Sequence, residues 1–194
     1  MILNTIDFTN FYKQTRSIFS KHFADDEVNQ LMEFVEILAD ANFRCYRANM
    51  TVIDLRQIDP EGHKFLTDNR IAEMEWVARN VGEYRVSSKA RINQYISKVK
   101  SKNMVVESSM WANDDIVYSI GEMMDRLSIE IIKREDFTKN NRPSHMFESS
   151  KKLSDRVEKY LIQKLEEIDK KGFYECVHEQ RTYDLEGITK ELVL

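Results

Sequence analysis

Two pairs of acidic residues have the types and the spacing that could do chemistry. Glu33 and Glu36 form one acid-x-x-acid pair, and Glu122 and Asp125 form a second. Residues three apart lie on the same face of a helix, so each pair would present two carboxylates together. Four carboxylates around one cavity could bind Mg²⁺, which prefers oxygen ligands and engages substrate phosphates. Carboxylates buried without a metal need a cation or a shifted pKa instead.

The two pairs resemble those of all-α nucleotide pyrophosphohydrolases, in which four carboxylates hold Mg²⁺. That resemblance implies a metal-dependent hydrolase as an alternative function, with these four residues as ligands. The pairs of those enzymes lie one helical hairpin apart, whereas 85 residues separate Glu36 from Glu122 here. Solvated positions near a helix start explain Glu33 and Glu36 more simply. We therefore expect no cofactor and no metal, and keep Mg²⁺ for the alternative alone.

The surroundings of Glu122 and Asp125 indicate a central helix. Apolar residues occupy one broad face of 116–132, and further apolar residues lie beside the two acids on the other side: Tyr118, Ile129 and Ile132. A helix that is apolar on both sides is normally buried in its bundle. We expect both carboxylates to be at least half buried and one to contact a cation from another helix. The candidate cations are Arg44, Arg47 and Arg181.

The segment from Gly121 to Ile129, followed by Lys133, resembles a stretch of uncharacterised helical bacterial proteins with a Gly-Glu-x-x-Asp-Arg-Leu-Ser-Ile motif. Residues 179–185 are similar to a later helix of those proteins. Glu130 departs from the pattern, which has an apolar residue there. The resemblance implies a helical fold and no particular reaction. It marks a charged cluster that we interpret as structural: Glu122, Asp125, Arg126, Arg181 and Asp184.

Other patterns that could do chemistry are incomplete. Glu175-x-x-His178 matches half of a di-iron motif, but the chain has no second Glu-x-x-His. The cysteines and histidines lack zinc spacing, and the sequence has neither a glycine-rich phosphate loop nor a recognisable nucleophile. We therefore interpret the chain as a non-enzymatic interaction or assembly protein.

A basic stretch covers residues 79–102, which hold seven bases and one acid. The bases are Arg79, Arg85, Lys89, Arg91, Lys98, Lys100 and Lys102. They flank an apolar face, which suits helix packing with snorkelling side chains, or contact with phosphates or an acidic protein surface. Residues 25–40 hold six acids and no base, so the two stretches could meet within one chain or between copies. We expect a protein partner or a homo-oligomer, with a nucleic-acid-associated protein as a second alternative.

The amino-acid composition indicates the type of fold that positions these charged residues. Five glycines and two prolines in 194 residues are too few for the turns of a sandwich, a barrel or a doubly wound sheet. The sequence predicts an all-α antiparallel bundle of five to six helices, two of them long, in a single domain covering 1–194. Residues 25–102 could form a hairpin-like extension. The expected helices are 8–23, 25–58, 65–99 with a kink or a fresh N-cap near Ser87, 113–136 capped by Asn113–Asp115, 153–171, and a last one from Phe173.

The remaining signals concern location. The two cysteines fall in helix-like runs and form no spaced disulfide framework, which favours a reducing compartment. The first residues lack the basic and apolar regions of a signal peptide. Apolar runs are far shorter than the roughly 20 residues of a spanning helix. We expect a soluble, cytoplasmic protein without a membrane partner.

Overall fold

The computed structural model describes residues 2–58, 65–100, 106–107, 119–171 and 176–177. Within these ranges the chain forms five helices: α1 (Thr9–Phe19), α2 (Asp25–Ile58), α3 (Phe65–Val99), α4 (Ile120–Lys139) and α5 (Ser144–Lys171). Two short strands, β1 (Val106–Glu107) and β2 (Cys176–Val177), pair in parallel. The prediction of an all-α bundle with two long helices is confirmed.

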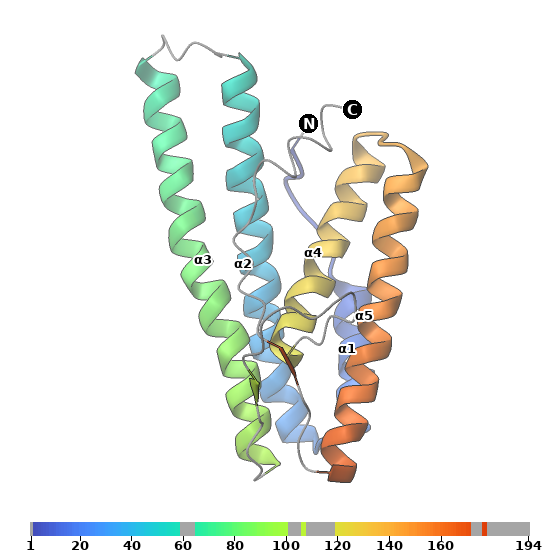
Figure 1. Ribbon diagram of the computed structural model, residues 1–194. Helices are drawn as coiled ribbons and strands as arrows, with labels where there is room; N and C mark the ends of the chain where they lie inside the picture. Colours follow the sequence, from blue (N-terminus) through green and yellow to red (C-terminus); the bar gives the residue numbers. More distant parts are fainter. Residues whose placement is uncertain (1, 59–64, 101–105, 108–118, 172–175, 178–194) are drawn as a thin grey trace.

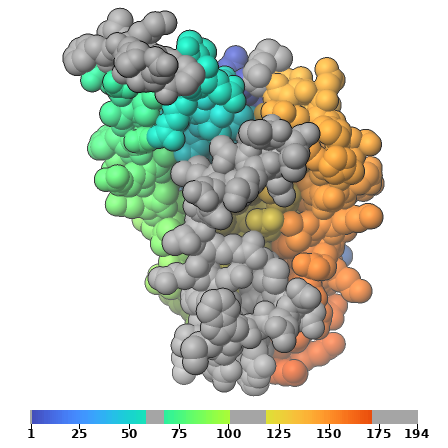
Figure 2. Space-filling view, turned by 45° about the horizontal axis from the view of Figure 1, so that its top comes forward, coloured from blue at the N-terminus to red at the C-terminus, as the bar shows by residue number. Residues whose placement is uncertain are grey.

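The helices form two antiparallel hairpins (Figure 1). The first is long and consists of α2 and α3, and the second consists of α4 and α5. Helix α4 packs against both α2 and α3, and α1 packs against α2. In Figure 2, α3 in green and α5 in orange lie on opposite sides of the visible face. Helix α4 is therefore the element that joins the two hairpins.

The core draws on all five helices. One fully buried side chain from each is Phe19, Leu31, Ile92, Met123 and Leu161. Burying a side chain of this size stabilises the fold by roughly 1.5–3 kcal/mol. Within the described residues, no helix is both long and apolar enough to cross a membrane.

The start of α4 differs from the prediction. Ser119 is extended, its hydroxyl accepts the Glu122 N–H at 3.3 Å, and the Glu122 carboxylate accepts the Ser119 N–H at 3.0 Å. This reciprocal capping box satisfies two backbone donors and starts the helix at Ile120. The predicted start near 113 is therefore wrong, and the expected caps Asn113–Asp115 lie outside the described residues.

Helix α3 continues through the serines that we expected to interrupt it. The hydroxyls of Ser87 and Ser88 donate to the Tyr84 carbonyl at 3.0 and 2.8 Å. Such back-bonding keeps the hydroxyls satisfied inside a helix, so no new N-cap is needed. The predicted fresh N-cap near Ser87 is wrong.

The expected last helix also needs correction. The residues described in that region, Cys176 and Val177, form strand β2 and pair with Val106 and Glu107. Their backbone groups bond to a distant segment instead of closing helical turns, and Val favours strands. The rest of the predicted helix lies outside the described residues.

The first turn of α4 approaches the backbone of α3 closely. A Cβ atom on Gly121 would lie 2.4 Å from the Lys89 carbonyl oxygen. Asn93 of α3 holds the same turn, because its side-chain oxygen accepts the Gly121 N–H at 2.9 Å and its amide donates to Ser119 Oγ at 3.1 Å. Only glycine permits this approach without a shift of one backbone.

We predict that Gly121→Ala lowers the free energy of unfolding by about 1–3 kcal/mol, because backbone atoms must move apart. The matched control is Gly82→Ala on α3, where, outside the adjacent backbone of its own helix, nothing lies within 4 Å of the new Cβ. That change should be neutral or stabilise by up to about 1 kcal/mol, because alanine favours helix. Urea denaturation of both variants measures the difference, and equal midpoints would contradict the prediction.

Candidate functional site

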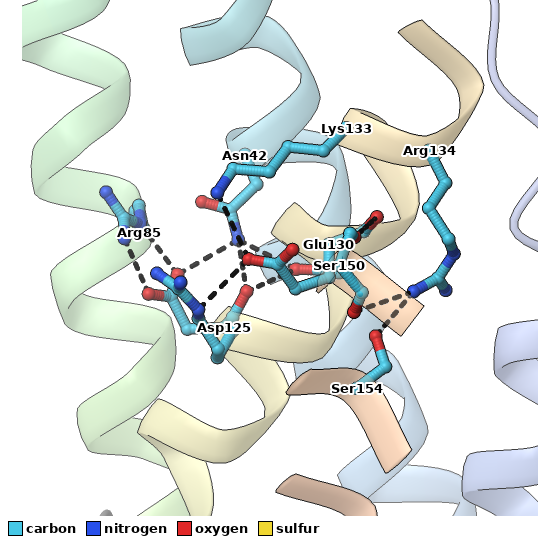
Figure 3. Close-up of polar contacts among 10 residues, drawn as sticks. Asn42, Arg85, Asp125, Glu130, Lys133, Arg134, Ser150 and Ser154 are labelled. Carbon is cyan, nitrogen blue, oxygen red and sulfur yellow. Dashed lines mark hydrogen bonds and ion pairs between the residues drawn. The ribbon is translucent and has the colours of Figure 1, made fainter. Parts of the chain in front are cut away.

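Asp125 is the centre of a buried polar network (Figure 3). It lies on α4 and is 6% exposed. Arg85 of α3 donates to both carboxylate oxygens, through Nε at 2.6 Å and Nη2 at 2.5 Å. Asn42 of α2 donates to Asp125 Oδ1 at 2.9 Å and to Ser128 Oγ at 2.8 Å. The network thus joins three helices through one carboxylate.

A second buried carboxylate lies one turn further along α4. Glu130 is 1% exposed, and the Arg126 Nε and Lys133 Nζ atoms lie 3.1 and 3.2 Å from its Oε1. Both cations belong to α4 and reach the solvent, as snorkelling side chains do. The Glu130 carbonyl accepts the Ser150 hydroxyl of α5 at 3.2 Å. A charge at this buried position is tolerated because two cations neutralise it.

Arg134 continues this polar line toward α5. Its Nη1 donates to Ser154 Oγ at 2.5 Å and to the Ser150 carbonyl at 3.5 Å (Figure 3). Burial lowers the pKa of Arg134 from its ordinary value, and nearby acids such as Glu130 oppose that effect. The guanidinium faces a cavity of about 340 Å³ between α1, α4 and α5.

The cavity has a mixed lining. Its charged lining is balanced, with Arg134 and Lys151 against Asp155 and Glu158, and its other walls include apolar side chains. Across the described part of the chain, no three His, Cys, Asp or Glu residues are arranged to hold a metal.

The four carboxylates of the magnesium alternative are not brought together. Glu33 and Glu36 are exposed on α2, Glu122 caps α4, and Asp125 is bound by Arg85. The four residues that the alternative assigns to Mg²⁺ therefore have separate positions and contacts in the fold.

The structure divides the predicted charged cluster. Asp125 is buried and Glu122 is partly buried, and Arg126 contacts Glu130. Arg181 and Asp184 lie outside the described residues. The cation on Asp125 is Arg85, a member of the basic stretch. The candidates Arg44 and Arg47 stay on their own helix, where Arg44 pairs with Asp40 and Arg47 lies over the Phe43 ring.

Three members of the network were missed in the sequence: Asn42, Ser128 and Glu130 as a buried acid. A signal was present for Asn42, which follows Leu38 by four residues on the apolar face of α2. A polar residue at such a position indicates a buried partner.

The basic stretch also divides. Arg85 is directed to the core. Lys89 is partly buried, and its backbone carbonyl lies next to Gly121 of α4. Lys100 binds Asp169 at 2.7 Å and lies over the Phe23 ring at 4.5 Å. The exposed members are Arg79, Arg91 and Lys98, and Lys102 lies outside the described residues. Of the seven bases predicted as an interaction patch, Arg85 and Lys100 therefore make contacts within this chain.

Large apolar side chains lie among the exposed bases of α3. Trp76, Tyr84 and Val86 are exposed to 64%, 67% and 62%. Residues two apart lie about 160° from each other around a helix, so Tyr84 and Val86 lie at opposite edges of the exposed side of α3, with Trp76 between them in direction. The exposed side of α3 thus carries separate large apolar side chains together with Arg79 and Arg91.

Comparisons with known proteins identify no matching family model, no matching curated protein and no matching solved structure. Function is therefore inferred from the contacts of this chain alone.

A cluster of ion pairs joins three segments close to the end of α3, the end of α5 and the start of α2. The carboxylate of Asp169 on α5 contacts His22 Nδ1 at 2.6 Å and Lys100 Nζ at 2.7 Å. Lys100 also donates to the His22 carbonyl. Burial raises the pKa of Asp169, but the hydrogen bonds from His22 and Lys100 outweigh burial and leave that pKa below its ordinary value.

Asp125→Ala should lower the free energy of unfolding by about 3–5 kcal/mol, because it removes the buried carboxylate that accepts both hydrogen bonds from the partly buried Arg85 guanidinium. The control is Glu166→Ala, which removes a carboxylate from an exposed pair with Lys170. An exposed pair of this kind contributes less than about 1 kcal/mol. Thermal denaturation compares the two variants, and a melting temperature unchanged within about a degree for Asp125→Ala would contradict a structural role for the network.

Asp169→Asn should destabilise the fold in a pH-dependent way. The folded-state pKa of Asp169 is lowered, so its contribution is present above the ordinary aspartate pKa and is lost as the pH falls through the folded-state value. The stability difference between wild type and Asp169→Asn should therefore be largest near neutral pH and shrink in acid. Denaturation midpoints across acidic and neutral pH test this, with Glu148→Gln, an exposed site near the start of α5, as the control. A difference that does not vary with pH would refute it.

Proposed function

We propose that this chain is a non-enzymatic interaction protein whose α3 surface binds an acidic protein surface. The observation that carries the proposal is the exposure of Trp76, Tyr84 and Val86 beside the exposed bases of the same helix. Tryptophan, tyrosine and arginine contribute most of the binding energy in many interfaces, because they combine large apolar area with polar contacts.

The interior supports a structural use of its charges. Asp125 accepts hydrogen bonds from Asn42 and Arg85, which connect helices. Glu130 accepts one from Lys133 and lies within ion-pair distance of Arg126. A catalytic acid or base needs room for a substrate at the proton that it transfers. These carboxylates are enclosed by their own partners instead.

An acidic protein partner fits the surface better than nucleic acid does. The exposed bases of α3 alternate with large apolar side chains, and the neighbouring helix α2 carries exposed acids at Asp26, Glu33 and Asp40. Those acids would repel a phosphate backbone that approached both helices. The net charge of −4 gives no general attraction to polyanions.

The test replaces the apolar part of the surface, in the variant Trp76→Ser/Tyr84→Ser/Val86→Ser. Tagged wild type is expressed in its native host together with a differently tagged copy, so that capture of a second copy is also detected. It should capture a partner protein in stoichiometric amount, which mass spectrometry quantifies. The triple variant should capture at least about tenfold less, which corresponds to a loss of about 1.4 kcal/mol. The fold of the variant is checked by circular dichroism.

A matched control removes three exposed side chains from α5 instead, in Lys152→Ser/Arg156→Ser/Lys159→Ser. This control should capture as much as wild type. Equal capture by both variants, or no stoichiometric partner for wild type, would refute the proposal. Sub-micromolar binding of duplex DNA, lost on Arg91→Glu/Lys98→Glu and weakened steeply by salt, would refute it in favour of nucleic acid.

A further inference from the structure

Two charged stripes of opposite sign lie on the long hairpin. The basic stripe consists of Arg91 and Lys98 on α3, in line with the neutral Tyr84, and the acidic stripe consists of Asp26, Glu33 and Asp40 on α2. Residues seven apart return to nearly the same side of a helix, so each set forms a line along its helix. All six residues are exposed.

Both stripes point away from α4. Asn42 of α2 and Asn93 of α3 contact α4 through Asp125 and Ser119. Asp40 and Arg91 each precede one of these asparagines by two residues, which places them about 160° around the helix from it. The two stripes therefore share the open side of the α2–α3 hairpin.

The stripes also lie at the same level along the hairpin. The Phe34 and Tyr95 rings meet at 5.9 Å between centroids, which fixes the level of the two antiparallel helices. From this pair, each residue forward along α2 corresponds to one residue backward along α3, because the two helices are antiparallel. Asp40 therefore lies level with residue 89, and Glu33 with residue 96. Arg91 then falls between Asp40 and Glu33, and Lys98 falls just beyond Glu33 toward Asp26. The cations of one helix alternate in height with the carboxylates of the other.

We infer that the acidic partner is a second copy of this chain, whose α2 acidic stripe pairs with the α3 basic stripe while the reverse pairing forms on the other side. This inference rests on the proposed function of the α3 surface. A two-fold axis parallel to the hairpin would place α2 of each copy over α3 of the other. Rotation about such an axis does not shift residues along the hairpin, so the heights compared above also hold between the two copies. Acid then meets base twice, as a self-complementary interface requires.

The contacts around the acidic stripe fit this partner. Ile37 is 44% exposed beside Glu33 and Asp40 and provides apolar area for the stem of an opposing arginine. Asp40 is paired with Arg44 on its own helix at 2.8 Å, with both side chains exposed. An exposed pair of this kind is weak and can be exchanged for one with a second copy.

The test uses two complementary charge reversals at exposed positions. In the variant Arg91→Glu/Lys98→Glu both stripes are acidic. In the variant Glu33→Lys/Asp40→Lys the α2 stripe keeps Asp26 but carries two lysines, so both stripes have a net positive charge. Sedimentation velocity should show a dimer for wild type and monomers for each variant alone, with the dimer dissociation constant raised at least about tenfold. An equimolar mixture should form a heterodimer, because each stripe then faces its opposite.

The control Lys152→Glu/Lys159→Glu reverses two exposed bases on α5 and should remain dimeric. The proposed pairing would be overturned if each charge-reversal variant formed a dimer on its own, or if their mixture stayed monomeric. A wild type that is monomeric but captures another protein through Trp76, Tyr84 and Val86 would overturn this inference and leave the proposed function standing. A wild type that captures neither would overturn both.

Discussion

The bidentate contact between Arg85 and Asp125 determines how the two hairpins meet. Two charges of opposite sign are withdrawn from water, and a buried charge is tolerated only when its partner is held in good geometry. Asn42 adds a third helix to the same carboxylate, so α2, α3 and α4 are fixed relative to one another by a single side chain. The close approach of Gly121 to α3 lies one turn away on α4 and depends on the same placement.

The buried network and the exposed surface are linked through the rotation of α3. Tyr84 and Arg85 are neighbours, and the first is exposed while the second is directed to the core. Once Asp125 fixes the direction of Arg85, the helix geometry decides which residues face the solvent. The interaction surface on α3 is therefore a consequence of the core, and a loss of the Arg85 contact would disturb both.

The helices were predictable from sequence because their apolar residues repeat with the period of a helix, and the near absence of glycine and proline leaves little material for other folds. The capping box at Ser119 and Glu122 has a local spacing that the sequence displays, but the prediction placed the cap at Asn113–Asp115 instead. The partner of Asp125 was not predictable, because seven bases lie in one stretch and only the packing of α3 on α4 selects Arg85. The strand pair was also beyond prediction, since β1 and β2 depend on a pairing between distant segments.

Segregated charge is unfavourable for an isolated helix. Glu33, Glu36 and Asp40 are spaced three or four apart on α2, and like charges at this spacing destabilise a helix by a few tenths of a kcal/mol per pair. The acids of the first turn, Asp25 to Glu27, gain from the helix dipole, whereas Glu33 to Asp40 lie too far from the N-terminus. Burial, together with the charges of Glu36 and Asp40, raises the pKa of Tyr12 to about 12, in keeping with the negative potential of this region. An opposing row of cations would relieve that repulsion, and α3 of a second copy carries such a row at the matching level.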